Sequence, residues 1–231
     1  MAVTSFLAMT AAEFCGSSFL PEKIAWMACH FSPYSLGLSN LPRYIPENSL
    51  LIVNDITPIR GHDPKIVAEQ LLGCVETFSC FGVLLDFQRD CNEEILPVIS
   101  EILETLPCPV AVTECYAKNL TCPVFLPPLP HHIPLKEWVA PWQGRDIWLE
   151  TALDGEEILL SEKGISFFPL SGSFPQDGHK DEILHCHYHI SLTDNSARFV
   201  LWRTKEDIEF LLLEADSLNI RTAVSLYQEF Q

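Results

Sequence analysis

Acidic side chains stand at the expected ends of several buried, strand-like segments. They are Asp55, Asp86, Glu114, Glu150 and Glu229. If these segments are parallel strands of a barrel, their carboxyl ends meet at one mouth, so the carboxylates would converge there. Two carboxyl groups across such a mouth can cleave a glycosidic bond, one as acid and the other as nucleophile, base or orienting group. Each residue could equally face solvent or cap the next helix.

The segments that must position these carboxylates are apolar runs of strand length, at residues 23–30, 49–55, 82–88 and 109–116. Continuous apolar runs are typical of parallel strands that are buried on both faces. Two amphipathic helices are predicted between them. One spans 63–79, with Asp63 as N-cap and Pro64 in the first turn, and the other spans about 92–105. This alternation predicts right-handed βαβ units in a parallel sheet.

The second half of the chain has a different pattern. Residues 122–130 resume as an apolar, proline-rich strand, and hairpins are expected over 147–170 and 183–202. A helix over 204–219 and a strand over 221–230 follow. The sequence therefore predicts an α/β fold, a (β/α)8-type barrel with some helices missing or replaced by β-hairpins in the second half. It is expected to be one domain over 1–231, with an open doubly wound sheet as the alternative.

A motif at residues 81–88, FGVLLDFQ, adds a family resemblance. It resembles the strand motif of family 18 glycoside hydrolases (chitinase-like), in which Asp-Gly-apolar-Asp-apolar-Asp-x-Glu ends in the catalytic acid. The matching positions are Gly82, Val83, Leu85, Asp86 and the aromatic Phe87. Phe81 and Leu84 replace two of the acidic positions, and Gln88 stands where the proton-donating glutamate belongs. Glutamine has no proton to give at any useful pH.

The resemblance implies a degenerate glycoside hydrolase-like barrel that binds a glycan-like ligand, such as an oligosaccharide, without cleaving it. Asp86 would remain as the orienting carboxylate, and we assign Glu114 with it to the catalytic position. The expected ligand-binding residues are Asp55, Gln88, Arg89, Glu150, Tyr227 and Glu229. Tyr227 is included because residues 223–227 resemble the closing strand of the family. Two alternatives stay open: an active hydrolase with Glu114 or Glu150 as a relocated acid, and a protein-interaction scaffold.

Histidines suggest a separate hypothesis. His185, His187 and His189 alternate along a predicted strand and so share one face, where they could chelate zinc with help from His131 or His132. They could equally form a polar stripe that faces solvent. No phosphate-binding glycine loop, serine-hydrolase elbow or zincin motif is present in the sequence, and we predict neither a metal nor a cofactor.

Composition excludes some partners. The 14 basic and 31 acidic residues give a net charge of −17, which disfavours nucleic acid and anionic membrane surfaces. The first 20 residues lack the positive region of a secretory signal, so we expect a cytoplasmic protein. Nine cysteines without a C-x-x-C pair predict reduced, mostly buried thiols.

Overall fold

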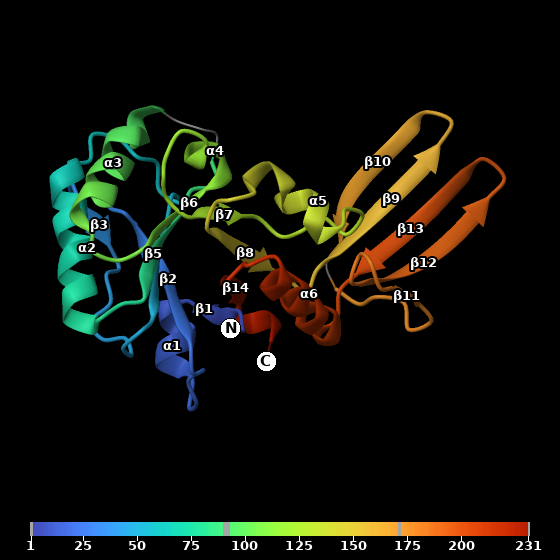
Figure 1. Cartoon of the computed structure of the whole chain (residues 1–231), viewed down its shortest axis with the longest axis horizontal. Coiled ribbons are helices and arrows are strands. Elements are labelled where there is room, and N and C mark those ends of the chain that lie inside the picture. The colour runs from blue at the N-terminus through green and yellow to red at the C-terminus, as the bar shows by residue number, and fades with distance from the viewer. Residues whose placement is uncertain (1, 90–92, 171, 231) are drawn as a thin grey trace.

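The computed structural model describes residues 2–89, 93–170 and 172–230, so Asn92, where the second predicted helix would begin, lies outside the described residues. Within these ranges, eight parallel strands form a ring (Figure 1): β1 (Thr4–Met9), β2 (Ile24–Phe31), β4 (Leu50–Asn54), β5 (Gly82–Asp86), β6 (Val110–Thr113), β7 (Val124–Leu126), β8 (Ile147–Thr151) and β14 (Thr222–Leu226). The ring is closed because β1 pairs with both β14 and β2. The predicted α/β barrel is confirmed, and the alternative of an open sheet is wrong. A two-residue strand, β3 (Leu38–Ser39), pairs antiparallel with β2.

Helices connect the barrel strands, and a last short one, η3, follows β14. The long ones are α2 (Pro64–Phe78), α3 (Leu96–Thr105) and α6 (Lys205–Ser217); the short ones are α1 (Ala11–Gly16), α4 (Glu114–Ala117), α5 (Leu135–Val139), η1 (Glu93–Ile95), η2 (Ala140–Trp142) and η3 (Tyr227–Glu229). Asp63 caps α2 as predicted, since its carboxylate accepts from the backbone N–H groups of Lys65 and Ile66 at 2.9 and 3.4 Å. Over the described residues, no helix combines the length and the hydropathy that a membrane span needs.

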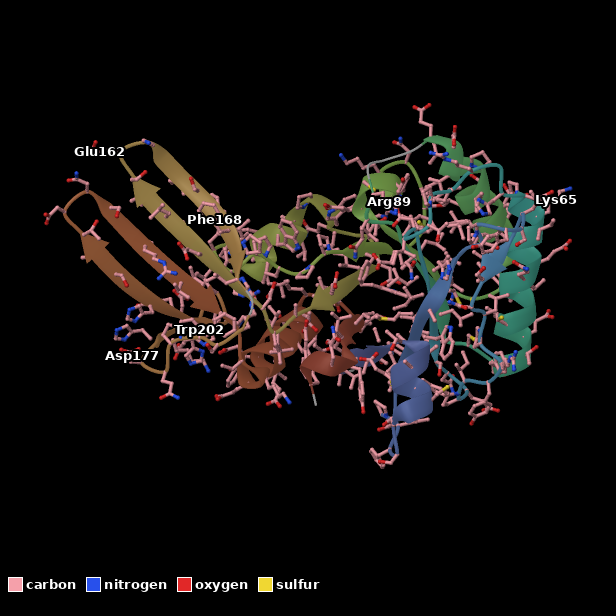
Figure 2. The ribbon with its side chains drawn as sticks, turned by 180° about the vertical axis from the view of Figure 1, so that it is seen from behind. Lys65, Arg89, Glu162, Phe168, Asp177 and Trp202 are labelled. Carbon is pink, nitrogen blue, oxygen red and sulfur yellow. The ribbon has the colours of Figure 1, made fainter. Side chains whose placement is uncertain are left out.

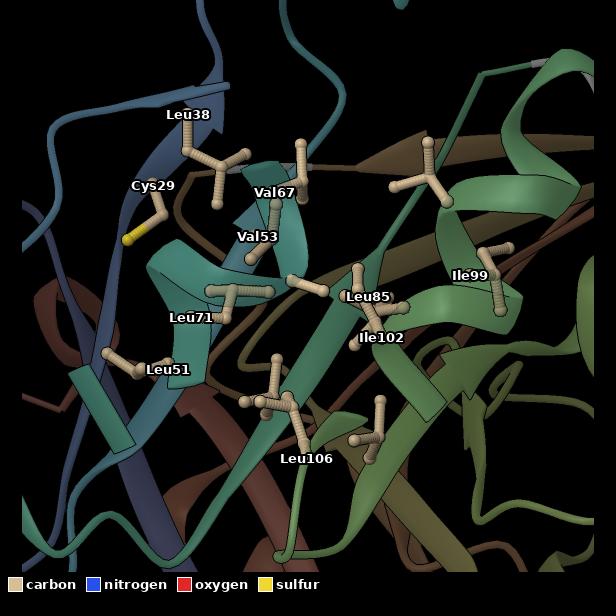
Figure 3. Packing of buried hydrophobic residues seen from close by; sticks show 14 of the residues in the cluster. Cys29, Leu38, Leu51, Val53, Val67, Leu71, Leu85, Ile99, Ile102 and Leu106 are labelled. Carbon is tan, nitrogen blue, oxygen red and sulfur yellow. The ribbon is translucent and has the colours of Figure 1, made fainter. Parts of the chain in front are cut away.

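Apolar side chains pack against the barrel strands in two layers, one outside the ring and one inside it. Leu51, Val53 and Leu85 point outward and pack under α2 and α3 (Figure 3). The alternate strand positions fill the barrel interior, which includes Leu84 and the fully buried Trp148. Because side chains alternate along a strand, Asp86 and Glu150, two residues beyond Leu84 and Trp148, project inward above this layer. The barrel thus positions both carboxyls at its mouth.

A five-stranded antiparallel sheet is inserted between β8 and α6. Its strands are β9 (Gly155–Ser161), β10 (Gly164–Leu170), β11 (His179–Asp181), β12 (Cys186–Thr193) and β13 (Ser196–Trp202), in the order β10-β9-β13-β12-β11. Figure 1 shows this sheet extending away from the barrel. The hairpin predicted over 183–202 is present as β12 and β13. Within the range 147–170, β9 and β10 form an antiparallel hairpin, but residues 147–151 are β8, a parallel strand of the barrel, so the antiparallel prediction is wrong for them. The hairpins form an added sheet that precedes a crossover helix, α6.

Cysteine burial follows the prediction in part. Cys29, Cys74, Cys122 and Cys186 are buried, whereas Cys15 is exposed. Burial raises the pKa of Cys186 to about 12, so this thiol stays protonated at neutral pH.

Candidate functional site

A pocket of about 590 Å³ opens at the carboxyl ends of β5, β6, β7 and β8. Its walls combine polar groups with an apolar side, and the lining residues are Asp86, Phe87, Gln88, Arg89, Thr113, Glu114, Cys115, Phe125, Pro127, Pro128 and Glu150. This volume lies within the usual range of small-ligand sites. The structure therefore brings together five of the predicted site residues: Asp86, Gln88, Arg89, Glu114 and Glu150.

Asp86 and Gln88 form the polar centre of one wall. The Gln88 amide nitrogen donates to the two carboxylate oxygens of Asp86 at 3.2 and 3.3 Å. Burial raises the pKa of Asp86, the hydrogen bond from Gln88 opposes this rise, and the charge of Asp55 adds to it. Asp86 thus has the environment of a functional carboxyl, but its neighbour in the motif is an amide.

Asp55 lies just after β4 and is buried. Its two carboxylate oxygens accept from the backbone N–H groups of Gln88 and Arg89 at 3.2 and 3.0 Å. The guanidinium of Arg89 donates in turn to the carbonyl of Ile56 (Arg89 is labelled in Figure 2). Asp55 therefore holds the turn that presents Gln88, a positioning role that its location at a strand end does not reveal.

Glu150 faces the same pocket from β8. Burial raises its pKa to about 7, and the negative charges of Asp86, Glu229 and Asp154 contribute further. Burial also raises the pKa of Glu229, whose carboxylate accepts from the backbone N–H of Leu153 at 2.8 Å. A carboxyl group with a pKa near 7 can hold and release a proton at neutral pH. Glu150 is therefore the group in the pocket best suited to act as an acid.

The remaining predicted residues have different positions. Glu114 is the first residue of α4 and lines the pocket. Tyr227 is the first residue of η3 and is not among the residues that line the pocket. Its hydroxyl lies 3.2 Å from the hydroxyl of Ser17. The apolar wall formed by Phe125, Pro127 and Pro128 was not predicted, although the proline-rich run after β7 was a usable signal.

The histidines do not gather around a common point. His187 Nδ1 lies 2.8 Å from Asp207, His185 Nε2 lies 2.8 Å from Glu214, and His189 is 3.8 Å from Asp177. His185 also has a φ of 46° and precedes β12, so it does not share the strand face. In the described part of the chain, no three metal-ligating side chains are placed to hold one ion. The hypothesis of a shared zinc site is therefore wrong for these residues.

No protein-family model and no curated protein matches the sequence. Solved structures do match the fold. An N-acetylglucosaminidase of glycoside hydrolase family 18 from Paenibacillus barengoltzii is 11% identical, covers 99% of this chain and 96% of its own, and gives a TM-score of 0.64. The spore cortex-lytic enzyme SleL from Bacillus cereus is 9% identical, with coverage of 96% and 70% and a TM-score of 0.56.

A third similar structure is a family 18 chitinase from Cycas revoluta. It is 11% identical, covers 96% of this chain and 94% of its own, and gives a TM-score of 0.56. That protein carries a glycine-to-tryptophan and a glutamate-to-glutamine substitution and is in complex with (GlcNAc)4. At these identities the likeness concerns the fold. The chain has an α/β barrel whose fold is similar to that of family 18 glycoside hydrolases, the family that the motif at residues 81–88 resembles.

Proposed function

We propose that the pocket at the barrel mouth binds an oligosaccharide containing N-acetylglucosamine units and does not hydrolyse it through residue 88. The observation that carries the proposal is the hydrogen-bonded pair of Gln88 and Asp86, at the place where the motif would have its acid. The similar structures include an N-acetylglucosaminidase and a glutamine-substituted chitinase bound to (GlcNAc)4. Both support this ligand class.

The pocket offers complementary groups to such a ligand. Asp86 can accept hydrogen bonds, and Gln88 Oε1 accepts none from the described residues, so it is available to a ligand N–H or O–H. Pro127 and Pro128, which are partly exposed above the buried Phe125, present an apolar surface to the faces of sugar rings. Because Gln88 has no proton to donate, the ligand would not be hydrolysed through position 88.

Calorimetric titration with (GlcNAc)4, followed by chromatography of the ligand, tests the proposal. We expect binding with intact ligand, and affinity that falls about tenfold in Gln88→Ala as one charge-assisted hydrogen-bond network is lost. Gln143→Ala is the matched control, because Gln143 lies before β8 at the opposite end of the barrel. Absence of binding, or equal affinity in both variants, would contradict the proposal.

A second candidate function is hydrolysis with Glu150 as a relocated acid. The observation in its favour is the pKa of about 7 in a pocket that also holds Asp86. This function predicts turnover that survives Gln88→Ala and disappears in Glu150→Gln. If turnover were lost in Glu114→Gln but not in Glu150→Gln, the acid would be Glu114, the other residue that the sequence suggested.

The remaining expectations from composition stay predictions. They are a cytoplasmic location, a single domain, and no nucleic acid or membrane partner. A scaffold that binds another protein would show neither binding nor cleavage of (GlcNAc)4.

A further inference from the structure

The carboxyl group of Glu150 has no positive partner within the pocket. It lies half-buried on β8, and no hydrogen bond or ion pair joins it to the residues that the structure describes. The charges that act on its pKa belong to Asp86, Glu229 and Asp154, and all three are negative. A desolvated carboxylate without a cation is unfavourable. Glu150 therefore either keeps a proton or receives a positive group from a ligand.

Two of these neighbouring carboxylates already have donors within the chain. Asp86 accepts from the side-chain amide of Gln88 at 3.2 and 3.3 Å, and Glu229 accepts from the backbone N–H of Leu153 at 2.8 Å. In each case the hydrogen bond opposes the rise in pKa that burial causes. No such hydrogen bond from the described residues acts on Glu150, where burial and three negative charges all raise the pKa. Glu150 is thus the carboxyl in this group that is left open to a donor from a ligand.

The pocket as a whole carries more negative than positive charge. Its described lining contains three carboxyl groups, those of Asp86, Glu114 and Glu150, and one cation, Arg89. The guanidinium of Arg89 already donates to the carbonyl of Ile56, in the turn after β4. A concave site lined mainly by one sign of charge focuses the electrostatic potential and raises the local concentration of the opposite charge. The lining therefore favours a cationic over a neutral group on a bound sugar.

We propose that the preferred ligand of this pocket carries at least one free amine, as in glucosamine, and that its ammonium group pairs with Glu150. The inference rests on the proposed function, because it narrows the ligand class of the same site from acetylated to partly unacetylated oligosaccharides. Acetylation turns an ammonium with three N–H donors and a full charge into a neutral amide with one N–H donor. A glucosamine unit thus supplies the positive donor that Glu150 lacks.

A proton held by Glu150 does not prevent this pairing. Burial raises the pKa of Glu150 to about 7, and an amine as basic as an α-amino group is the stronger base. The proton then moves from the carboxyl oxygen to the amine nitrogen, and the pair becomes a carboxylate and an ammonium with the same number of bound protons. The positive charge in turn lowers the pKa of Glu150. The pair therefore forms near neutral pH whether the proton arrives on the protein or on the ligand.

Affinities for (GlcN)4 and (GlcNAc)4, measured by calorimetric titration at about pH 7, test the inference. We expect (GlcN)4 to bind wild type about tenfold more tightly, because a charge-assisted hydrogen bond is about twice as strong as a neutral one. In Glu150→Gln the affinity for (GlcN)4 should fall about tenfold, whereas that for (GlcNAc)4 should stay within about threefold of wild type. Retained binding of (GlcNAc)4 also shows that the variant has folded.

The net charge of −17 attracts any cationic ligand, so a control must separate this effect from the pairing. Glu162→Gln removes one acidic group at the tip of the hairpin, far from the barrel (Figure 2), and should keep the preference within about twofold of wild type. Long-range attraction is largely screened at about 0.5 M NaCl, whereas a partly buried pair is screened much less. We therefore expect the preference of wild type for (GlcN)4 to remain at this salt concentration.

Failure of the inference and failure of the proposed function give different results. If (GlcNAc)4 bound as tightly as (GlcN)4 or more tightly, the inference would be overturned and the proposed function would stand. If neither ligand bound, the proposed function would be wrong and the inference with it. Binding of (GlcN)4 alone, lost in Glu150→Gln, would support the pairing and correct the acetylated ligand class. A preference that persisted in Glu150→Gln, or that vanished at about 0.5 M NaCl, would come from the net charge and would overturn the pairing.

Discussion

The side-chain amide of Gln88 hydrogen-bonds to both carboxylate oxygens of Asp86, the last residue of β5. This pairing stabilises the ionised form of Asp86 and opposes the effect of its burial on the pKa. A glutamate at position 88 would remove the donor and add a second carboxyl. The two groups would then share a proton and titrate as a pair.

We predict that Gln88→Glu gives at most trace hydrolysis of a fluorogenic chitobioside. Phe81 and Leu84 would still occupy two of the acidic positions of the motif, and catalytic groups that act as a unit are not restored one at a time. Initial rates of fluorophore release, measured beside wild type, check this. Efficient turnover by the single variant would contradict the interpretation that the site is degenerate at several positions of the motif.

The triple variant Phe81→Asp, Leu84→Asp, Gln88→Glu would restore the full motif only if it still folds with two new buried charges. Leu84 is 1% exposed in the barrel interior, and the ring of Phe81 lies 5.0 Å from that of Phe6. Two carboxylates at these positions would cost several kcal/mol. We therefore expect the triple variant to unfold, which circular dichroism would show.

Glu150 predicts an unusual dependence of stability on pH. Its pKa is raised from 4.5 to about 7, so the folded state binds a proton that the unfolded state releases between these values. The free energy of unfolding of wild type should then fall as pH rises from about 4.5 to 7, by on the order of 2–3 kcal/mol from this group. Glu150→Gln should lack that decline.

Urea unfolding at pH 4.5 and pH 8 measures the effect. The free energy of unfolding of Glu150→Gln relative to wild type should increase between the two pH values. Glu162→Gln is the control, because Glu162 is exposed in the turn after β9 and should follow wild type. Parallel profiles for wild type and Glu150→Gln would show that Glu150 titrates normally.

His187 is predicted to stabilise the junction of the inserted sheet with α6. Its Nδ1 lies 2.8 Å from Asp207, which is 0% exposed and also accepts from Thr204. His187→Ala should lower the free energy of unfolding by about 2 kcal/mol, since a buried carboxylate loses a partner. His189→Ala, two residues along the same strand and 3.8 Å from the exposed Asp177, should change it by less than about 0.5 kcal/mol. Equal effects of the two substitutions would contradict this role.

Local signals in the sequence predicted much of the first half of the barrel. The N-cap Asp63 and Pro64 mark the start of α2, and continuous apolar runs mark β4 and β5. β1 was not predicted as a strand. Its role depends on closure of the ring, in which residues 4–8 pair with 222–226, and no local pattern encodes a contact between the two ends of the chain.

The sequence predicted those residues of the candidate site that stand at the carboxyl ends of barrel strands. Asp86, Glu114 and Glu150 meet at one pocket because parallel strands bring their carboxyl ends together. Contacts between loops were not predictable. The pairing of Asp55 with two amides after β5 requires the exact approach of two turns, and the left-handed conformation of His185 interrupts an alternation that looked regular in the sequence.

Asp55 provides the last prediction, because the sequence assigns it to the ligand and the structure gives it a positioning role. Asp55→Ala would leave the N–H groups of Gln88 and Arg89 without their acceptor, so we expect a loss of about 2 kcal/mol in unfolding free energy together with weaker (GlcNAc)4 binding. Asp55→Asn retains one acceptor oxygen and should lie between wild type and Asp55→Ala in both measurements. Urea unfolding and calorimetric titration of the same samples provide the comparison. If Asp55→Ala abolished binding while stability stayed at the wild-type value, Asp55 would contact the ligand directly and the positioning role would be wrong.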